Sequence, residues 1–140
     1  MSWDYLNDVF GKFRNHKTRF SALETEAKKL LTLFVNRKMK DKDFAEAFIK
    51  VRVQFDELTT VDGHITIDQD TPLWLNMLLG FHFGEWLRYQ RVKWYFEEHP
   101  EELTDDYREQ FMSIQEMGYD ERFKGICEDL LNELNTSGRV

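Results

Sequence analysis

The segment from Pro72 to His99 constrains the fold more than any other part of the chain. It reads PLWLNMLLGFHFGEWLRYQRVKWYFEEH. On a helix with about 100° between successive residues, its large apolar side chains share one broad arc, wider than the stripe of an ordinary surface helix. That arc contains Trp74, Leu75, Leu78, Leu79, Phe81, Trp86, Tyr89, Val92 and Phe96. We therefore expect a central, aromatic-rich helix with neighbours on several sides.

The same segment does not fit a membrane span. A span needs about 20 consecutive, predominantly apolar residues. Here the apolar run ends at Arg88 and already contains His82 and Glu85, whose burial in hydrocarbon is costly. We expect no contact with a membrane.

Helical periodicity continues on both sides of the central segment. Further helices are predicted from Trp3 to about Asn15, from Ser21 towards Met39, from Asp41 or Asp43 to Leu58, from Thr104 or Asp105 to Gly118, and from about Asp120 to Leu134. Ser21 and Glu24 have the Ser-x-x-Glu spacing of a capping box. No linker divides the 140 residues. The sequence predicts one all-α domain, residues 1–140, with about six helices packed around the central one.

Between the helix that ends at Leu58 and the central helix, apolar and polar residues change from helical spacing to an alternation with a period of two residues. Thr60 and Val61 are followed by the turn residues Asp62 and Gly63, and then by a second apolar and polar alternation that runs to Ile67. An Asp-Gly pair between two such runs is a strong β-hairpin signal. We expect a small β-hairpin insertion in the helical domain.

The single cysteine and the first residues of the chain bear on localisation. Cys127 excludes an internal disulfide, and it lies beside Ile126 on the apolar stripe of the last helix, which predicts a buried thiol. The first residues are amphipathic and lack the apolar core of a secretory signal. We expect a cytoplasmic protein.

Charge is distributed unevenly along the chain. Residues 1–58 carry a net charge of +3 and residues 59–140 a net charge of −10. Seven carboxylates lie within 13 residues, opposed only by Arg108; they are Glu97, Glu98, Glu101, Glu102, Asp105, Asp106 and Glu109. Such a surface favours encounter with a basic protein, and we predict that it is the partner-binding surface. The overall charge of −7 argues against direct nucleic-acid binding by the basic first third.

One polar cluster lies within the apolar arc of the central segment. Glu85 has His82 three residues before it, and Arg88 and Tyr89 three and four residues after it. A carboxylate with a tuned pKa beside a histidine suits acid–base chemistry in a polar pocket. The alternative, which we favour, is an internal pair that fixes helix packing, because nothing elsewhere supplies an obvious nucleophile.

No catalytic residue, metal or cofactor is assigned from the sequence. His82 and Glu85 are spaced His-x-x-Glu, the reverse of the Glu-x-x-His pairs of di-iron bundles, and the spacing occurs once. A cysteine pair that could bind zinc is also lacking. We expect a protein that is not an enzyme.

Three functions remain open at this point. The preferred one is a non-enzymatic protein-binding module, most concretely an immunity or antitoxin-type inhibitor that docks its acidic surface on a basic partner such as a toxin nuclease. The second is a small helical enzyme or ligand-binding domain with its site around Glu85. The third is a self-associating regulatory or scaffold protein, for instance a homodimer, because 12 Phe, 5 Tyr and 4 Trp are more large rings than a small core easily encloses.

Overall fold

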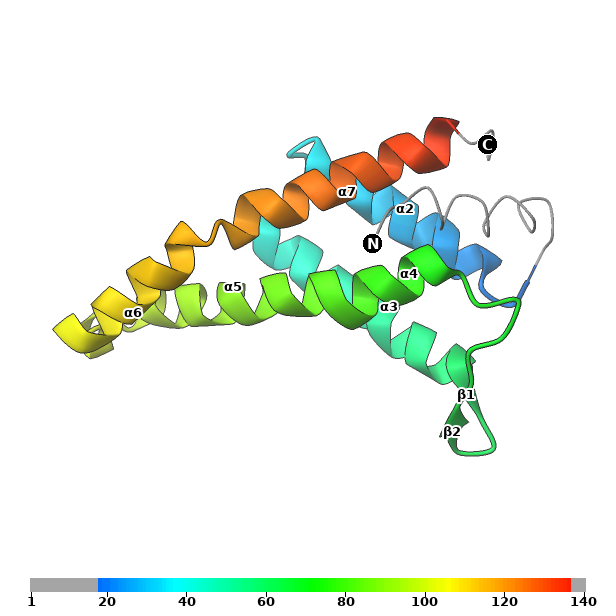
Figure 1. The fold of residues 1–140 in the computed structure, drawn as a ribbon, viewed down its shortest axis with the longest axis horizontal. Helices are drawn as coiled ribbons and strands as arrows, with labels where there is room; N and C mark the ends of the chain where they lie inside the picture. The colour runs from blue at the N-terminus through cyan, green and yellow to red at the C-terminus, as the bar shows by residue number, and fades with distance from the viewer. Residues whose placement is uncertain (1–17, 137–140) are drawn as a thin grey trace.

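The computed structural model describes residues 18–136, which form helices and one small hairpin (Figure 1). In chain order the elements are α2 (Ser21–Val35), α3 (Asp41–Thr59), β1 (Thr60–Val61), β2 (His64–Ile65), α4 (Leu73–Met77), the π-helical segment η1 (Leu78–His82), α5 (Phe83–Glu98), the 3₁₀ segment η2 (Pro100–Glu102), α6 (Asp105–Glu116) and α7 (Tyr119–Thr136). The predicted fold class, all-α with a small hairpin, is confirmed. None of the described helices combines the length and the apolar character that crossing a bilayer requires.

The described residues contain fewer helices than the six predicted for the whole chain. Segments α4, η1 and α5 follow one another without a break and form one long rod, so residues 18–136 contain five helical rods. The predicted helix from Trp3 to about Asn15 lies outside the described residues.

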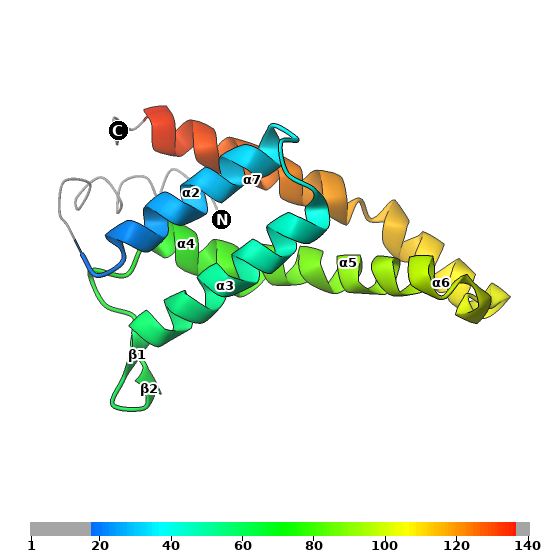
Figure 2. The same ribbon diagram turned by 180° about the vertical axis from the view of Figure 1, so that it is seen from behind.

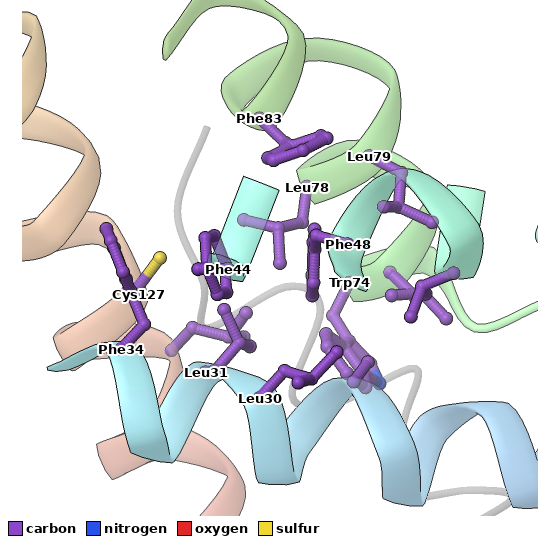
Figure 3. Packing of buried hydrophobic residues seen from close by; sticks show 14 of the residues in the cluster. Leu30, Leu31, Phe34, Phe44, Phe48, Trp74, Leu78, Leu79, Phe83 and Cys127 are labelled. Atoms are coloured by element: carbon purple, nitrogen blue, oxygen red, sulfur yellow. The ribbon is translucent and has the colours of Figure 1, made fainter. Parts of the chain in front are cut away.

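The core is a cluster of aromatic rings from four helices (Figure 3). Rings of α2 and α3 stack at 4.1 Å between Phe34 and Phe44, and rings of α5 and α7 stack at 5.0 Å between Trp86 and Phe123. Phe44 also lies edge-on to Phe83, at 6.1 Å. These five rings are almost completely buried, so none of the four helices can leave without exposing aromatic surface to water.

Helix α2 begins and ends differently from the prediction. Its first residue is preceded by Phe20, and no side chain caps the helix. Ser21 Oγ instead accepts a hydrogen bond from the Thr18 backbone N–H at 2.9 Å. Glu24 accepts the indole N–H of Trp74 at 3.1 Å. The predicted capping box is therefore wrong, because its carboxylate joins α2 to α4.

The other end of α2 is set by the turn that leads into α3. The helix ends at Val35, short of the predicted Met39. Arg37 adopts a φ of 57°, which lies in the left-handed region and cannot continue a right-handed helix. The following residues, through Lys40, form the connection to α3.

The central rod departs from the regular periodicity assumed for it. In η1 the backbone makes a π-helical turn, which holds more residues than an α-helical one and so shifts the angular position of the side chains after it. Phe81, predicted in the core, is 62% exposed. Val92 is 37% exposed and lies in the part of α5 after Gln90, which contains no buried residue. These two core predictions are wrong.

The rest of the predicted arc faces the interior. Its members that are buried are Trp74, Leu75, Leu78, Leu79, Trp86 and Tyr89, and Phe96 is half-buried.

The hairpin has the predicted turn and first strand, but its second strand ends at Ile65, short of the predicted Ile67. Asp62 and Gly63 both have positive φ, 51° and 80°, as a two-residue type I′ turn requires. The antiparallel register pairs Thr60 with Ile65 and Val61 with His64. The hairpin projects from the helical body beyond the end of α3 (Figure 2).

We predict that Phe44→Ala lowers the free energy of unfolding by about 3–5 kcal/mol, because it removes the ring shared by α2, α3, α5 and α7 and leaves a cavity. Val53→Ala on the same helix, at a side chain that is 51% exposed, should change it by no more than about 0.5 kcal/mol. Urea denaturation of the two variants measures both values. Similar losses for the two variants would contradict the aromatic cluster as the main source of stability.

Candidate functional site

The acidic arm, which we define as residues 95–117, comprises the end of α5, η2 and α6 and extends from the helical body (Figures 1 and 2). It contains eight carboxylates and one cation, Arg108, for a net charge of −7. The rest of the chain balances 18 carboxylates with 18 Lys and Arg side chains. The whole formal net charge of the protein therefore resides in this arm.

The seven predicted partner-binding carboxylates all lie in the acidic arm and are all exposed; they are Glu97, Glu98, Glu101, Glu102, Asp105, Asp106 and Glu109. Six of them make no ion pair with any other described residue, and the seventh, Glu98, lies 3.7 Å from Lys42 Nζ. One of the six, Glu102, accepts a hydrogen bond from the Tyr95 hydroxyl. That hydrogen bond raises the pKa of Tyr95 above its ordinary value, with burial and the charges of Glu102 and Glu101 acting in the same direction.

The acidic arm is attached to the body by ring contacts rather than by a buried core. Neither η2 nor α6 contains a buried residue. Phe111 of α6 stacks on Tyr89 of α5 at 6.1 Å and lies edge-on to Phe96 at 6.2 Å. A twelve-residue helix with such limited burial leaves most of its side chains free for contact with another molecule.

Apolar side chains are interspersed among the carboxylates of the acidic arm. Between 46% and 55% of each of these side chains is exposed; they are Tyr95, Tyr107, Met112 and Met117. Tyrosine and methionine are enriched in protein–protein interfaces relative to the rest of the surface. The arm thus combines charge for attraction with apolar surface for contact.

The tip of the acidic arm also brings together a group of residues that could hold a metal ion. His99, Glu101 and Glu102 each offer one ligand atom, and these atoms all lie within 4.8 Å of one another. Within residues 18–136 no other three such side chains converge in this way. Sequence reasoning missed the group because it looked for helical spacing. The useful signal was Pro100, which directly follows His99, the C-cap residue of α5, and starts the tight turn of η2.

The second predicted site, around Glu85, is built differently from the expectation. Glu85 Oε1 lies 3.0 Å from Arg122 Nη1 of α7, and Arg88 of its own helix is exposed. His82 and Glu85 both line a cavity between α5 and α7 with a volume of about 10 Å³, close to the least that one water molecule needs. Arg88 and Tyr89 do not line that cavity.

Tyr89 instead faces the junction of α6 and α7. It lies between Phe111, stacked at 6.1 Å, and Tyr119 at 5.8 Å. Burial raises the pKa of Tyr89, and the negative charges of Asp120 and Glu97 raise it further. The structure therefore separates the four predicted pocket residues into the pair His82 and Glu85, a buried Tyr89 and an exposed Arg88.

A polar contact that sequence reasoning missed holds α7 against α5. Asp120 Oδ1 accepts the indole N–H of Trp86 at 2.8 Å and an amide N–H of the fully buried Gln90. Asp120 Oδ2 also lies 3.9 Å from Lys93 Nζ. The sequence indicated Asp120 only as the start of a helix. Its partners lie 30 and 34 residues away, so no local pattern identifies them.

Comparison of the chain with models of known protein families, with curated proteins and with solved structures finds no match. The functional argument therefore proceeds from the residues and their geometry.

We predict that acid destabilises the protein partly through His82. Burial lowers the pKa of His82 below its ordinary 6.5, and Arg122 acts in the same direction, whereas Glu85 opposes them. When the pKa of a histidine is lower in the folded state than in the unfolded state, the unfolded chain binds the proton more readily. The stability that the neutral histidine contributes is therefore fully present at pH values above the unfolded-state pKa and is lost as the pH falls below it. The melting temperature should fall between pH 7.5 and pH 5.5.

The variant His82→Gln isolates this contribution. It should show a smaller fall in melting temperature over the same pH range, whereas His64→Gln, at an exposed position of the hairpin, should keep the wild-type fall. Thermal denaturation followed by circular dichroism gives both slopes. An unchanged slope in His82→Gln would contradict the assignment.

Proposed function

We propose that this protein is a non-enzymatic protein-binding module that docks its acidic arm on a basic protein. The most concrete form is an immunity or antitoxin-type inhibitor that covers the positive cleft of a toxin nuclease. The observation that carries the proposal is the coincidence of two properties in residues 95–117. This segment holds the entire net charge of the chain, and neither η2 nor α6 has a buried residue.

The carboxylates of the arm are available for a partner. Six of the seven predicted binding residues have no ion pair within residues 18–136, namely Glu97, Glu101, Glu102, Asp105, Asp106 and Glu109. Crowded like charges raise the electrostatic energy of the free protein, and a basic surface relieves this repulsion when it binds. Complementary charge of this kind accelerates encounter and selects the partner, in a way that salt weakens.

The apolar side chains supply the contact that charge alone does not. Exposed ion pairs are individually weak, about 0–1 kcal/mol each. Binding energy at interfaces is concentrated in a few aromatic and long side chains that become desolvated. Tyr95 and Tyr107, about half exposed among the carboxylates, have the character of such anchors.

Self-association through the arm is less favoured. Two arms of net charge −7 repel one another, and a symmetric dimer would place identical acidic surfaces together. An enzyme site around Glu85 is also less favoured. The carboxylate is held by Arg122 at 3.0 Å, and the adjoining cavity of about 10 Å³ is far smaller than the roughly 300–1,000 Å³ of ligand pockets.

We predict that reversing four carboxylates, Glu101, Glu102, Asp105 and Asp106, to Lys abolishes partner capture. The change turns the net charge of the arm from −7 to +1. The tagged protein is used to capture partners from native lysate at low and high salt, and the captured protein is identified, purified and titrated calorimetrically. The affinity of the reversed variant should fall at least about 100-fold.

A control variant carries the same change of total charge outside the arm. Glu26, Glu46, Glu57 and Asp129 are exposed carboxylates of α2, α3 and α7, and their reversal to Lys should preserve most of the affinity. If the partner is a nuclease, the wild type should inhibit it stoichiometrically and the arm variant should not. Equal losses in the two variants, with both folded by circular dichroism, would refute docking through the arm.

A further inference from the structure

A cationic cleft lies where the α2–α3 connection meets α7. Its volume is about 560 Å³, and we define it by the cations Arg37, Lys38, Lys40 and Lys124 together with Phe34 and Asp41. The four cations and the single carboxylate give these residues a net charge of +3. The cleft lies outside the acidic arm, in the part of the chain where charges otherwise balance.

The cations of the cleft are not used in ion pairs within the described chain. No carboxylate of residues 18–136 lies within 4.0 Å of the charged nitrogens of Arg37, Lys38, Lys40 or Lys124. Other cations of the same region do pair, for example Lys42 with Glu98 at 3.7 Å. The Lys124 ammonium lies 5.7 Å from the centre of the Phe34 ring, at the wall of the cleft. Four positive charges thus line the cleft without a direct ion pair, and Asp41 is the one carboxylate beside them.

The backbone adds hydrogen-bond donors to the same place. The nineteen-residue helix α3 begins at Asp41 in the cleft, and no side chain caps its start. The first N–H groups of a helix have no partner inside the helix, and they carry the positive end of its dipole. Asp41 is the one lining carboxylate, and together with Asp43 in the same first turn it takes up part of this positive potential.

We propose that the cationic cleft binds a small molecule that carries a phosphate or diphosphate group. Arg and Lys side chains and free helical N–H groups are the donors that recognise phosphate oxygens. The cleft is wide open to solvent, and its volume of about 560 Å³ is large enough to admit such a group. A net charge of +3 matches the two or three negative charges of such a group.

A small phosphate compound fits the charge distribution better than a nucleic acid does. A polynucleotide extends beyond the cleft and approaches the acidic arm, whose net charge is −7. The ion pair between Lys42 and Glu98 shows that the start of α3 and the arm adjoin. Phosphates outside the cleft would therefore meet repulsion.

Calorimetric titration of the full chain with inorganic pyrophosphate at 50 mM and 200 mM NaCl tests the proposal. The wild type should bind one pyrophosphate per chain with saturation, more weakly at the higher salt. The variant Lys38→Ala/Lys40→Ala, at two exposed side chains, should bind at least about tenfold more weakly. The matched variant Lys29→Ala/Lys50→Ala removes two exposed lysines elsewhere and should bind within about twofold of the wild type.

Three outcomes would overturn the proposal. They are the absence of saturation up to 10 mM pyrophosphate, equal weakening in the two lysine variants, and tighter binding of a 12-nucleotide oligothymidylate than of pyrophosphate. The proposal is independent of the proposed function, because the variant with four reversed carboxylates in the arm should bind pyrophosphate at least as tightly as the wild type. Partner capture is thus tested by the variant of the acidic arm, and pyrophosphate binding by the variant at Lys38 and Lys40.

Discussion

The structure depends on the shared burial of aromatic rings by α2, α3, α5 and α7. Phe44 has ring neighbours on all four of these helices, among them Phe34, Phe83 and Phe123. Such a cluster excludes water only when every helix is present, so the four helices must assemble together. Contacts that fix the arrangement, such as Asp120 with Trp86, lie at the edge of this cluster.

This arrangement separates the residues that stabilise the fold from those available for binding. The acidic arm contributes no buried residue from η2 or α6, and three of the four cations of the cationic cleft, Arg37, Lys38 and Lys40, are exposed. Surface substitutions at such positions usually change the free energy of unfolding little. Exposed residues of both surfaces can therefore be changed without conflict with core packing.

The sequence predicted the buried residues best where the helix is a regular α-helix. Phe44, Phe48, Val51 and Phe55 are spaced by three or four, and α3 buries them all. The prediction that Phe81 lies in the core was wrong because one π-helical turn changes the angle between successive side chains. No single residue in the sequence indicates that turn. The exposed carboxylates of the arm follow from composition, whereas the pairing of Glu85 with Arg122 depends on how two helices meet, 37 residues apart.

Cys127 was predicted to be a buried thiol, and the structure places it in the hydrophobic core (Figure 3). Burial raises the pKa of its thiol above the ordinary value and shields the sulfur from solvent, which makes the thiol unreactive in the folded protein. Modification by a thiol reagent therefore requires the core around Cys127 to open. Since the chain has one cysteine, the rate at which that cysteine is alkylated measures how often the core opens, without any label or engineered probe.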